Sequence, residues 1–293
     1  ARQVNAAEAA SKACELALDT ANVKEIVPNR INFSYRHDIA NIEEVFFLAY
    51  STKCKDYYLH RTIDDEASGY ILTKSVWVSG KTGIGKSDLL RHTLIENNIK
   101  YIYIDLSLCD SVEEMVCQIY ETTCDYFDEK AHVGNIKTII SSLADLLDSR
   151  CAENFSYIMV EEIPFEENSD EFHEFVRRLS QMIVYISTHT PNKVRFILSS
   201  IAMPKEALDT YRDKIKSLIH FIQLGDWTES ECIDLIDLLC NAVGLSWESE
   251  ELKFSFAKRM EYSPRRIKAS LKTCCSLDYR VINSNIVDKL VIR

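Results

Sequence analysis

The sequence predicts an α/β fold in which a parallel five-stranded sheet with helices on both faces is followed by a small all-helical domain. Short runs of β-branched and aromatic residues alternate with segments of helical periodicity between residues 75 and 224. Strands that alternate with helices pair in parallel, because each crossover connection requires a helix. Beyond residue 225 the strand-like runs end and helical patterns alone continue.

Five segments have the composition expected of buried strands. Each is short and rich in Val, Ile, Tyr or Phe, and polar or glycine residues bound it. They cover residues 75–78, 101–106, 155–160, 194–198 and 220–224. Apolar residues at helical spacing between them predict covering helices at about 111–126, 136–150 and 169–187.

Helix signals define the C-terminal module. Thr228 and Glu231 have the spacing of a capping box ahead of a helix over residues 232–242, and Gly244 is a stop signal for it. A second helix is expected over 247–260, and Ser263-Pro264 opens a third with an N-cap and a proline at the first helical position.

These signals divide the chain into three parts. Residues 1–29 contain an Ala-rich helical tract at 6–20 and form an accessory helix, residues 30–225 form the α/β domain, and residues 226–293 form the helical domain. An amphipathic helix through residues 42–49 is expected upstream of the first strand.

Composition indicates a globular protein of the reducing cytoplasm. The 293 residues are 46% hydrophobic, which is ample for a core, and the net charge of −11 argues against a surface built to neutralise nucleic-acid phosphates. The ten cysteines contain no C-x-x-C pair and are expected to be reduced core residues. No apolar run is long enough to span a bilayer, so we expect no membrane contact.

The most informative motif lies between the first strand and the helix that follows it. Residues 80–87 read Gly-Lys-Thr-Gly-Ile-Gly-Lys-Ser, which is the G-x-x-x-x-G-K-S spacing of a phosphate-binding P-loop. Glycines let successive N–H groups turn toward a phosphate, and the helix start adds its positive dipole end. The residues expected to hold the nucleotide are Gly80, Lys81, Thr82, Gly83, Ile84, Gly85, Lys86, Ser87 and Asp88.

Polar residues follow the third and fourth strands, and a basic pair begins a later helix. Glu161-Glu162 ends the third strand and Ser199-Ser200 ends the fourth. Arg265-Arg266 lies in the first turn of a helix, where the dipole disfavours cations by a few tenths to about 1 kcal/mol. A functional partner for these arginines would offset that cost.

In this order along the chain, the P-loop, the acidic pair, the polar pair and the helical module with Pro-Arg-Arg resemble the AAA+ ATPases and the related STAND signalling NTPases. The resemblance covers roughly residues 30–280. It implies ATP and Mg²⁺ as ligands, with Ser87 and Glu161 at the metal and Glu162 polarising the attacking water. The family usually has Asp where Glu161 stands, and the longer side chain would place the metal less well, so the resemblance supports nucleotide binding more strongly than hydrolysis.

The resemblance also implies roles for residues outside these motifs. Ser199, rather than Ser200, is similar to the sensor 1 residue that contacts the γ-phosphate or the attacking water. Arg265 is similar to the sensor 2 arginine that reaches from the lid to the γ-phosphate, and Arg36 is similar to a residue that lies against the adenine. Arg212 corresponds to a finger that reaches a neighbouring subunit's nucleotide, for which Arg177 and Arg178 are alternative candidates.

Three functional hypotheses follow. The first is an ATP-driven switch that couples nucleotide state to oligomerisation, in a ring, a filament or a larger protein assembly, with nucleic acid bound through the assembly. Defence signalling, transposition and replication control are its expected settings. The second is a nucleotide-binding scaffold with little or no hydrolysis, which the Glu161 substitution motivates. The third is a P-loop kinase that transfers phosphate to a small molecule.

Overall fold

The computed structural model describes residues 40–151, 156–163, 169–191, 193–204 and 212–291. These residues lie in one compact unit that runs from Ile39 to Arg293. The predicted accessory helix at 6–20 and the predicted base-contacting Arg36 lie outside the described residues.

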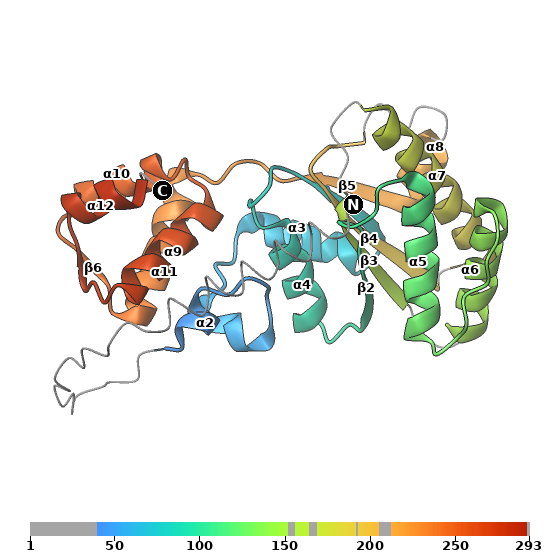
Figure 1. Cartoon of the computed structure of the whole chain (residues 1–293), viewed down its shortest axis with the longest axis horizontal. Coiled ribbons are helices and arrows are strands. Elements are labelled where there is room, and N and C mark those ends of the chain that lie inside the picture. Colours follow the sequence, from blue (N-terminus) through green and yellow to red (C-terminus); the bar gives the residue numbers. More distant parts are fainter. Residues whose placement is uncertain (1–39, 152–155, 164–168, 192, 205–211, 292–293) are drawn as a thin grey trace, which may run out of the picture. The chain divides into compact units, whose positions relative to one another are not determined.

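A parallel five-stranded sheet forms the centre of the fold, as the sequence predicts (Figure 1). The spatial order is β2-β3-β4-β1-β5, so β1 has β4 on one side and β5 on the other. The strands are β1 (Ser75–Ser79), β2 (Tyr101–Asp105), β3 (Ser156–Ile163), β4 (Val194–Ser200) and β5 (Ile219–Gln223). β1, which carries the P-loop at its carboxyl end, is therefore an inner strand.

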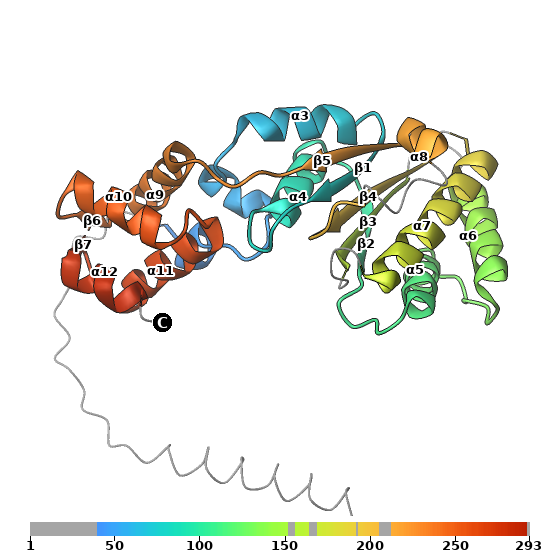
Figure 2. The ribbon, with the colours of Figure 1, turned by 90° about the horizontal axis from the view of Figure 1, so that it is seen from above.

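Helices cover both faces of the sheet (Figure 2). One face carries the helices α5 (Val112–Tyr126), α6 (Ile136–Arg150) and α7 (Asp170–His189). The other carries α3 (Thr62–Ile71) and α4 (Lys86–Glu96). α3 is absent from the sequence prediction, whereas α5, α6 and α7 agree with it to within about two residues.

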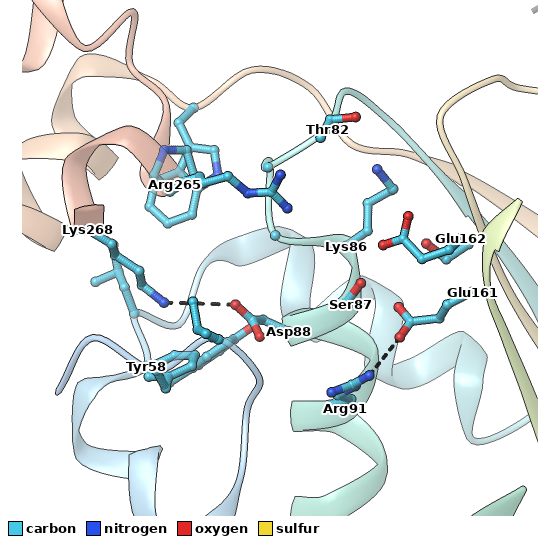
Figure 3. Close-up of a pocket in the computed structure, with 18 of the residues that line it drawn as sticks. Tyr58, Thr82, Lys86, Ser87, Asp88, Arg91, Glu161, Glu162, Arg265 and Lys268 are labelled. Carbon is cyan, nitrogen blue, oxygen red and sulfur yellow. Dashed lines mark hydrogen bonds and ion pairs between the residues drawn. The ribbon is translucent and has the colours of Figure 1, made fainter. Parts of the chain in front are cut away.

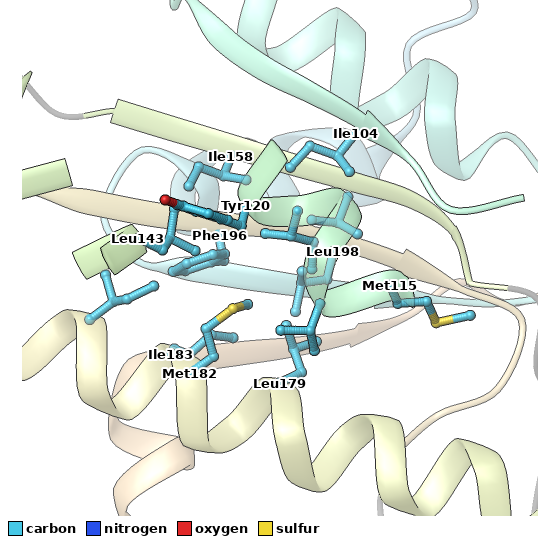
Figure 4. Close-up of a cluster of buried hydrophobic side chains, with 14 of the residues drawn as sticks. Ile104, Met115, Tyr120, Leu143, Ile158, Leu179, Met182, Ile183, Phe196 and Leu198 are labelled. Carbon is cyan, nitrogen blue, oxygen red and sulfur yellow. The ribbon is translucent and has the colours of Figure 1, made fainter. Parts of the chain in front are cut away.

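Alternation along the strands explains the two layers. Trp77, Ile158 and Phe196 point to the face covered by α5 to α7, where they join a large buried cluster. Figure 4 shows part of this cluster, with Ile158 and Phe196 labelled. Their neighbours Val76 and Met159 point to the opposite face and pack with α3 and α4. Because both faces are buried, the strands read as continuous apolar runs, and each fully buried large side chain stabilises the fold by about 1.5–3 kcal/mol.

The C-terminal domain confirms the predicted helix signals. Thr228 and Glu231 form the capping box of α9 (Glu229–Val243), Gly244 ends that helix in a left-handed conformation, and Ser263 caps α11 (Pro264–Ser276). The remaining helices are α10 (Glu250–Arg259) and α12 (Ser284–Val291). The domain also contains a short parallel ladder of β6 (Ser246–Trp247) and β7 (Val281–Ile282), which the all-helical expectation omits.

The segment upstream of α3 differs from the prediction. The expected helix over 42–49 is reduced to α2 (Ile42–Val45), and the short 3₁₀ helix η2 (Thr52–Tyr57) follows it. Val45 and Phe46 join the core of the C-terminal domain, whereas Phe47 packs in a separate cluster with Tyr50. Apolar side chains that follow one another in the sequence are thus buried in two different cores. A longer helix would present them on one apolar face, so the helix ends early.

Two further expectations concern cysteines and membranes. The nine cysteines within the described segments are all free thiols, and six of them are buried. In the described part of the chain, no helix is both long and apolar enough to cross a bilayer.

Candidate functional site

The P-loop connects β1 directly to α4. Gly83 and Gly85 have positive φ angles of 80° and 101°, which L-residues with side chains rarely adopt. Gly85 is the N-cap of α4, and its carbonyl accepts the first helical hydrogen bond, from the Leu89 N–H at 3.0 Å. The loop therefore ends where the unpaired N–H groups and the dipole of a helix begin.

Lys86 lies inside the curve of this loop. Its Nζ donates to the carbonyl oxygens of Gly80 at 2.7 Å and Lys81 at 3.1 Å. Burial is the main cause that lowers the pKa of Lys86, the nearby Arg265 lowers it further, and the carboxyl of Glu162 opposes both. A half-buried cation beside a second cation is an electrostatic setting that favours a polyanionic ligand.

The acidic pair lies at the end of β3, across from the P-loop (Figure 3). Glu161 is buried, whereas Glu162 is exposed and has a φ of 55°, in the left-handed region. The register between β3 and β4 shifts between Val160 and Ile163. Such a bulge redirects side chains, and here it lets two successive carboxylates both line the cavity.

Arg91 on α4 holds one oxygen of Glu161. Its Nη2 donates to Glu161 Oε2 at 3.0 Å, and its guanidinium lies 4.8 Å from the centre of the Tyr103 ring. Glu161 Oε1 is buried and makes no hydrogen bond of standard geometry with the described residues. Burial raises the pKa of Glu161, although the Ser87 hydroxyl and Arg91 act in the opposite direction.

The two serines that end β4 have different surroundings. Ser200 accepts a hydrogen bond from Trp77 Nε1 at 2.8 Å and donates to the Ala202 carbonyl at 2.5 Å, so its hydroxyl is used inside the fold. Both serines are buried and line the cavity. Because the Ser200 hydroxyl already has two partners within the fold, Ser199 is the better candidate for the polar group that faces a ligand.

The two arginines of α11 point in different directions. Arg266 pairs with Glu261 at 2.7 Å and is more than half exposed. Arg265 lies against the P-loop, so close that a Cβ added at Gly83 would meet Arg265 Nε at 3.1 Å. Arg265 of the C-terminal domain and Lys86 of the P-loop, which are far apart in the sequence, therefore line the same cavity.

The cavity has a volume of about 460 Å³, which is in the range of small-molecule sites. Part of its wall comes from residues that the sequence analysis does not select. Trp227, in the connection to the C-terminal domain, donates from Nε1 to the Ile84 carbonyl at 2.9 Å. The Arg61 guanidinium lies 4.5 Å from the centre of the Trp227 ring. Other such residues are Phe46, Phe47, Leu48, Tyr58, Leu59, Arg91 and Lys268.

The remaining predicted residues lie elsewhere. Arg177 and Arg178 both pair with Glu174 on their own helix, at 2.6 and 2.8 Å, and neither lines the cavity. Arg212 is the first residue of α8 (Arg212–Leu218), directly ahead of β5. Lys81 pairs with Asp226 at 2.7 Å.

No family model matches the sequence, and no curated protein matches it. Solved structures do match the fold. The ADP form of the Aeropyrum pernix ORC2 protein has a TM-score of 0.60 at 16% identity, over 86% of this chain and 72% of that chain. Cdc6p from Pyrobaculum aerophilum has a TM-score of 0.58 at 12% identity, over 85% and 70% of the two chains.

A Thermotoga maritima RuvB variant is also similar, with a TM-score of 0.51 at 14% identity over 81% of this chain and 70% of that chain. ORC, Cdc6 and RuvB proteins are AAA+ P-loop ATPases. The chain has the AAA+ fold. The structural likeness therefore bears out the resemblance seen in the sequence, and the helical content of the C-terminal domain, which carries Arg265, is consistent with an AAA+ lid.

Proposed function

We propose that this protein is an ATP-binding switch with the AAA+ fold that hydrolyses ATP and couples the state of the nucleotide to the position of its lid. The observation that carries the proposal is the contact of Arg265 on the lid helix with the P-loop at Gly83. A nucleotide in the cavity would contact the sheet domain through Lys86 and the lid through Arg265. The presence of the γ-phosphate would then strengthen the connection between the sheet domain and the lid.

The residues present fit a magnesium ion. Mg²⁺ prefers hard oxygen ligands, and the Ser87 hydroxyl and the unpaired, buried Oε1 of Glu161 are oxygens that line one cavity. The ion's chemistry when bound is to neutralise charge on the phosphates. Arg91 fixes the other Glu161 oxygen, so the longer side chain of Glu, compared with the usual Asp, is held in one orientation.

Hydrolysis is assigned to the exposed carboxylate of the acidic pair. Glu162 lies on the cavity near the Lys86 ammonium, where it can accept a proton from a water molecule that attacks the γ-phosphate. Ser199, from the adjacent strand β4, is the candidate to orient that water. The separate environments of Glu161 and Glu162 support separate roles: the buried, paired acid for the metal and the exposed acid for the water.

The test is a nucleotide-binding titration followed by a turnover assay on the same preparation. Fluorescent ATP and ADP analogues are titrated with Mg²⁺ and again with EDTA, and phosphate release is then measured across protein concentrations. Tight Mg²⁺-dependent binding with turnover supports the proposal. Binding without turnover at any concentration would instead favour the scaffold hypothesis, and turnover that needs a small-molecule phosphate acceptor would favour a kinase.

An assembly is the proposed setting of the switch. One structural neighbour, the Aeropyrum pernix ORC1 protein, is described in complex with DNA, with a TM-score of 0.59 at 14% identity over 85% of this chain and 68% of that one. With a net charge of −11, we expect weak DNA binding by a single copy and stronger binding by an ATP-bound oligomer. Light scattering with and without ATP, followed by DNA anisotropy, tests both statements.

Arg212 is the proposed trans-acting residue of that assembly. If it reaches a neighbour's nucleotide, Arg212→Ala will abolish the rise of specific activity with protein concentration and leave the nucleotide affinity of the monomer unchanged. Arg178→Ala tests the alternative candidate, and Arg150→Ala is the matched control, because Arg150 pairs with Glu129 away from the cavity.

A further inference from the structure

Lys268 occupies an unusual position on the lid. It lies one turn after Arg265 on α11, and residues three apart project from the same side of a helix. Its side chain is 18% exposed, and its ammonium lies 3.4 Å from the centre of the Phe47 ring. Burial is the main cause that lowers the pKa of Lys268, so holding this charge here has a cost. Such a cost is typical of functional positions.

The partner of Lys268 is Asp88, the residue directly after the P-loop serine (Figure 3). Lys268 Nζ lies 3.8 Å from Asp88 Oδ2, while Asp88 Oδ1 accepts a hydrogen bond from the Tyr50 N–H at 3.1 Å. Asp88 therefore joins three segments: the P-loop helix, the stretch upstream of α3, and the lid. Asp88, which the sequence predicts as a nucleotide-binding residue, also lines the cavity, and its two carboxylate oxygens face Tyr50 and Lys268.

The two contacts of α11 restrain the same helix from adjacent turns. Arg265 meets the loop at Gly83, and Lys268 meets the first turn of the helix that the loop begins. A helix turn is about 5.4 Å long, so a lid held at Lys268 leaves little freedom in where the Arg265 guanidinium lies. Arg266, which pairs with Glu261 within the lid, adds no restraint of this kind.

We propose that Lys268 is a positioning residue for Arg265, and that its contacts with Asp88 and Phe47 set the lid so that the arginine reaches the terminal phosphate. This inference rests on the proposed function. It adds that discrimination between nucleoside triphosphate and diphosphate depends on a residue that touches neither phosphate. Lys268 acts through the lid, and Arg265 makes the contact.

The experiment measures the affinities of the full chain for a non-hydrolysable ATP analogue and for ADP, in wild type, Lys268→Met, Arg265→Met and the double variant. In Lys268→Met we expect about tenfold weaker binding of the ATP analogue, or about 1.4 kcal/mol, and less than about a threefold change for ADP. The double variant should bind the ATP analogue no more weakly than Arg265→Met alone, because Lys268 acts through Arg265.

Controls separate positioning from a loss of fold. Lys268→Arg keeps the cation and should restore most of the discrimination, and Asp88→Asn should reproduce part of the loss from the opposite side of the contact. Arg266→Met removes a cation from the same helix turn and should leave both affinities unchanged. Melting temperatures identify any variant that does not fold, in which case Lys268→Arg and Asp88→Asn carry the test.

Three results overturn the inference: a Lys268→Met variant that binds both nucleotides as wild type does, an equal loss of ATP-analogue and ADP affinity in Lys268→Met, and a double variant whose loss is the sum of the single losses. A wild-type protein that binds neither nucleotide would instead refute the proposed function itself.

Discussion

The two halves of the cavity are built in different ways. The P-loop half includes Thr82, Gly83 and residues 85–88 with Glu161 and Glu162, and most of it comes from one stretch of sequence between a strand and a helix. The lid half includes residues 46–48, 57–59, Arg61, Trp227, Leu235 and the α11 residues Pro264, Arg265, Lys268, Ala269 and Lys272, which come from several separate segments. Local backbone conformation positions the first half, whereas packing between distant segments positions the second.

This difference predicts how each half responds to substitution. Under the proposed function, side chains of the P-loop half contact the phosphates and the water, so their loss should affect binding or chemistry severely with little effect on the fold. Apart from Arg265, which is proposed to contact the terminal phosphate, side chains of the lid half hold segments together, so their loss should change affinity moderately and change stability as well.

The largest expected effect is on turnover. Glu162→Gln removes the proposed proton acceptor and should lower the rate of phosphate release by about 1,000-fold, because general-base catalysis contributes about 10²–10⁴. ATP affinity should change by less than about threefold, since the isosteric amide keeps the shape of the site and only one hydrogen bond is altered. Unchanged turnover would show that Glu162 is not the proton acceptor, and the chemistry would then depend on residues of the lid half.

The second effect is on binding. Lys86→Ala should weaken ATP affinity by about 100-fold, because it removes a charged donor to the phosphates. The melting temperature of the nucleotide-free protein should not fall, since burial lowers the pKa of Lys86 and the charge opposes folding at neutral pH. Calorimetry measures both quantities. Lys55→Ala removes another lysine, exposed and paired with Glu96 at the end of α4, and is the control. A lower melting temperature for Lys86→Ala would show that the P-loop half also holds the fold.

The third effect concerns the connection between the domains. Trp227→Phe deletes the hydrogen bond to the Ile84 carbonyl and should weaken ATP and ADP equally, by about fivefold, as one neutral hydrogen bond is worth about 1 kcal/mol. Equal losses would distinguish Trp227 from Lys268, whose loss should discriminate between the two nucleotides. Trp247→Phe is a matched control, because Trp247 does not line the cavity and its Nε1 makes no hydrogen bond of standard geometry with the described residues.

The smallest effect is a pH dependence of stability. His92 on α4 stacks on Tyr58 with ring centres 4.0 Å apart, and burial lowers its pKa. The unfolded chain then binds the proton more readily than the folded one, so stability is lost as the pH falls through the ordinary histidine value of about 6.5. Melting curves at pH 7.5 and 5.5 should show a smaller drop in His92→Phe than in wild type. Equal drops would assign the acid sensitivity to other groups, such as His220, whose pKa is also lowered by burial.

The sequence by itself determined the sheet, its covering helices other than α3, and the P-loop half of the site. Strand and helix periodicities are local. Gly83 and Gly85 have positive φ angles, which glycine adopts readily, so the residue type at these positions already indicates the backbone conformation. The caps at Thr228, Gly244 and Ser263 were likewise readable, because a cap and the helix it ends are adjacent in the chain.

The tertiary structure alone decided the lid half. Trp227 contacts a residue 143 positions away, and Arg61, Arg91 and Lys268 are single residues with no local pattern that marks them. It also decided that the helix after residue 42 is short, because Val45 and Phe47 are buried in different cores. Local sequence encodes backbone conformation, whereas contacts between distant side chains exist only after the chain has packed, and the lid half of this cavity consists of such contacts.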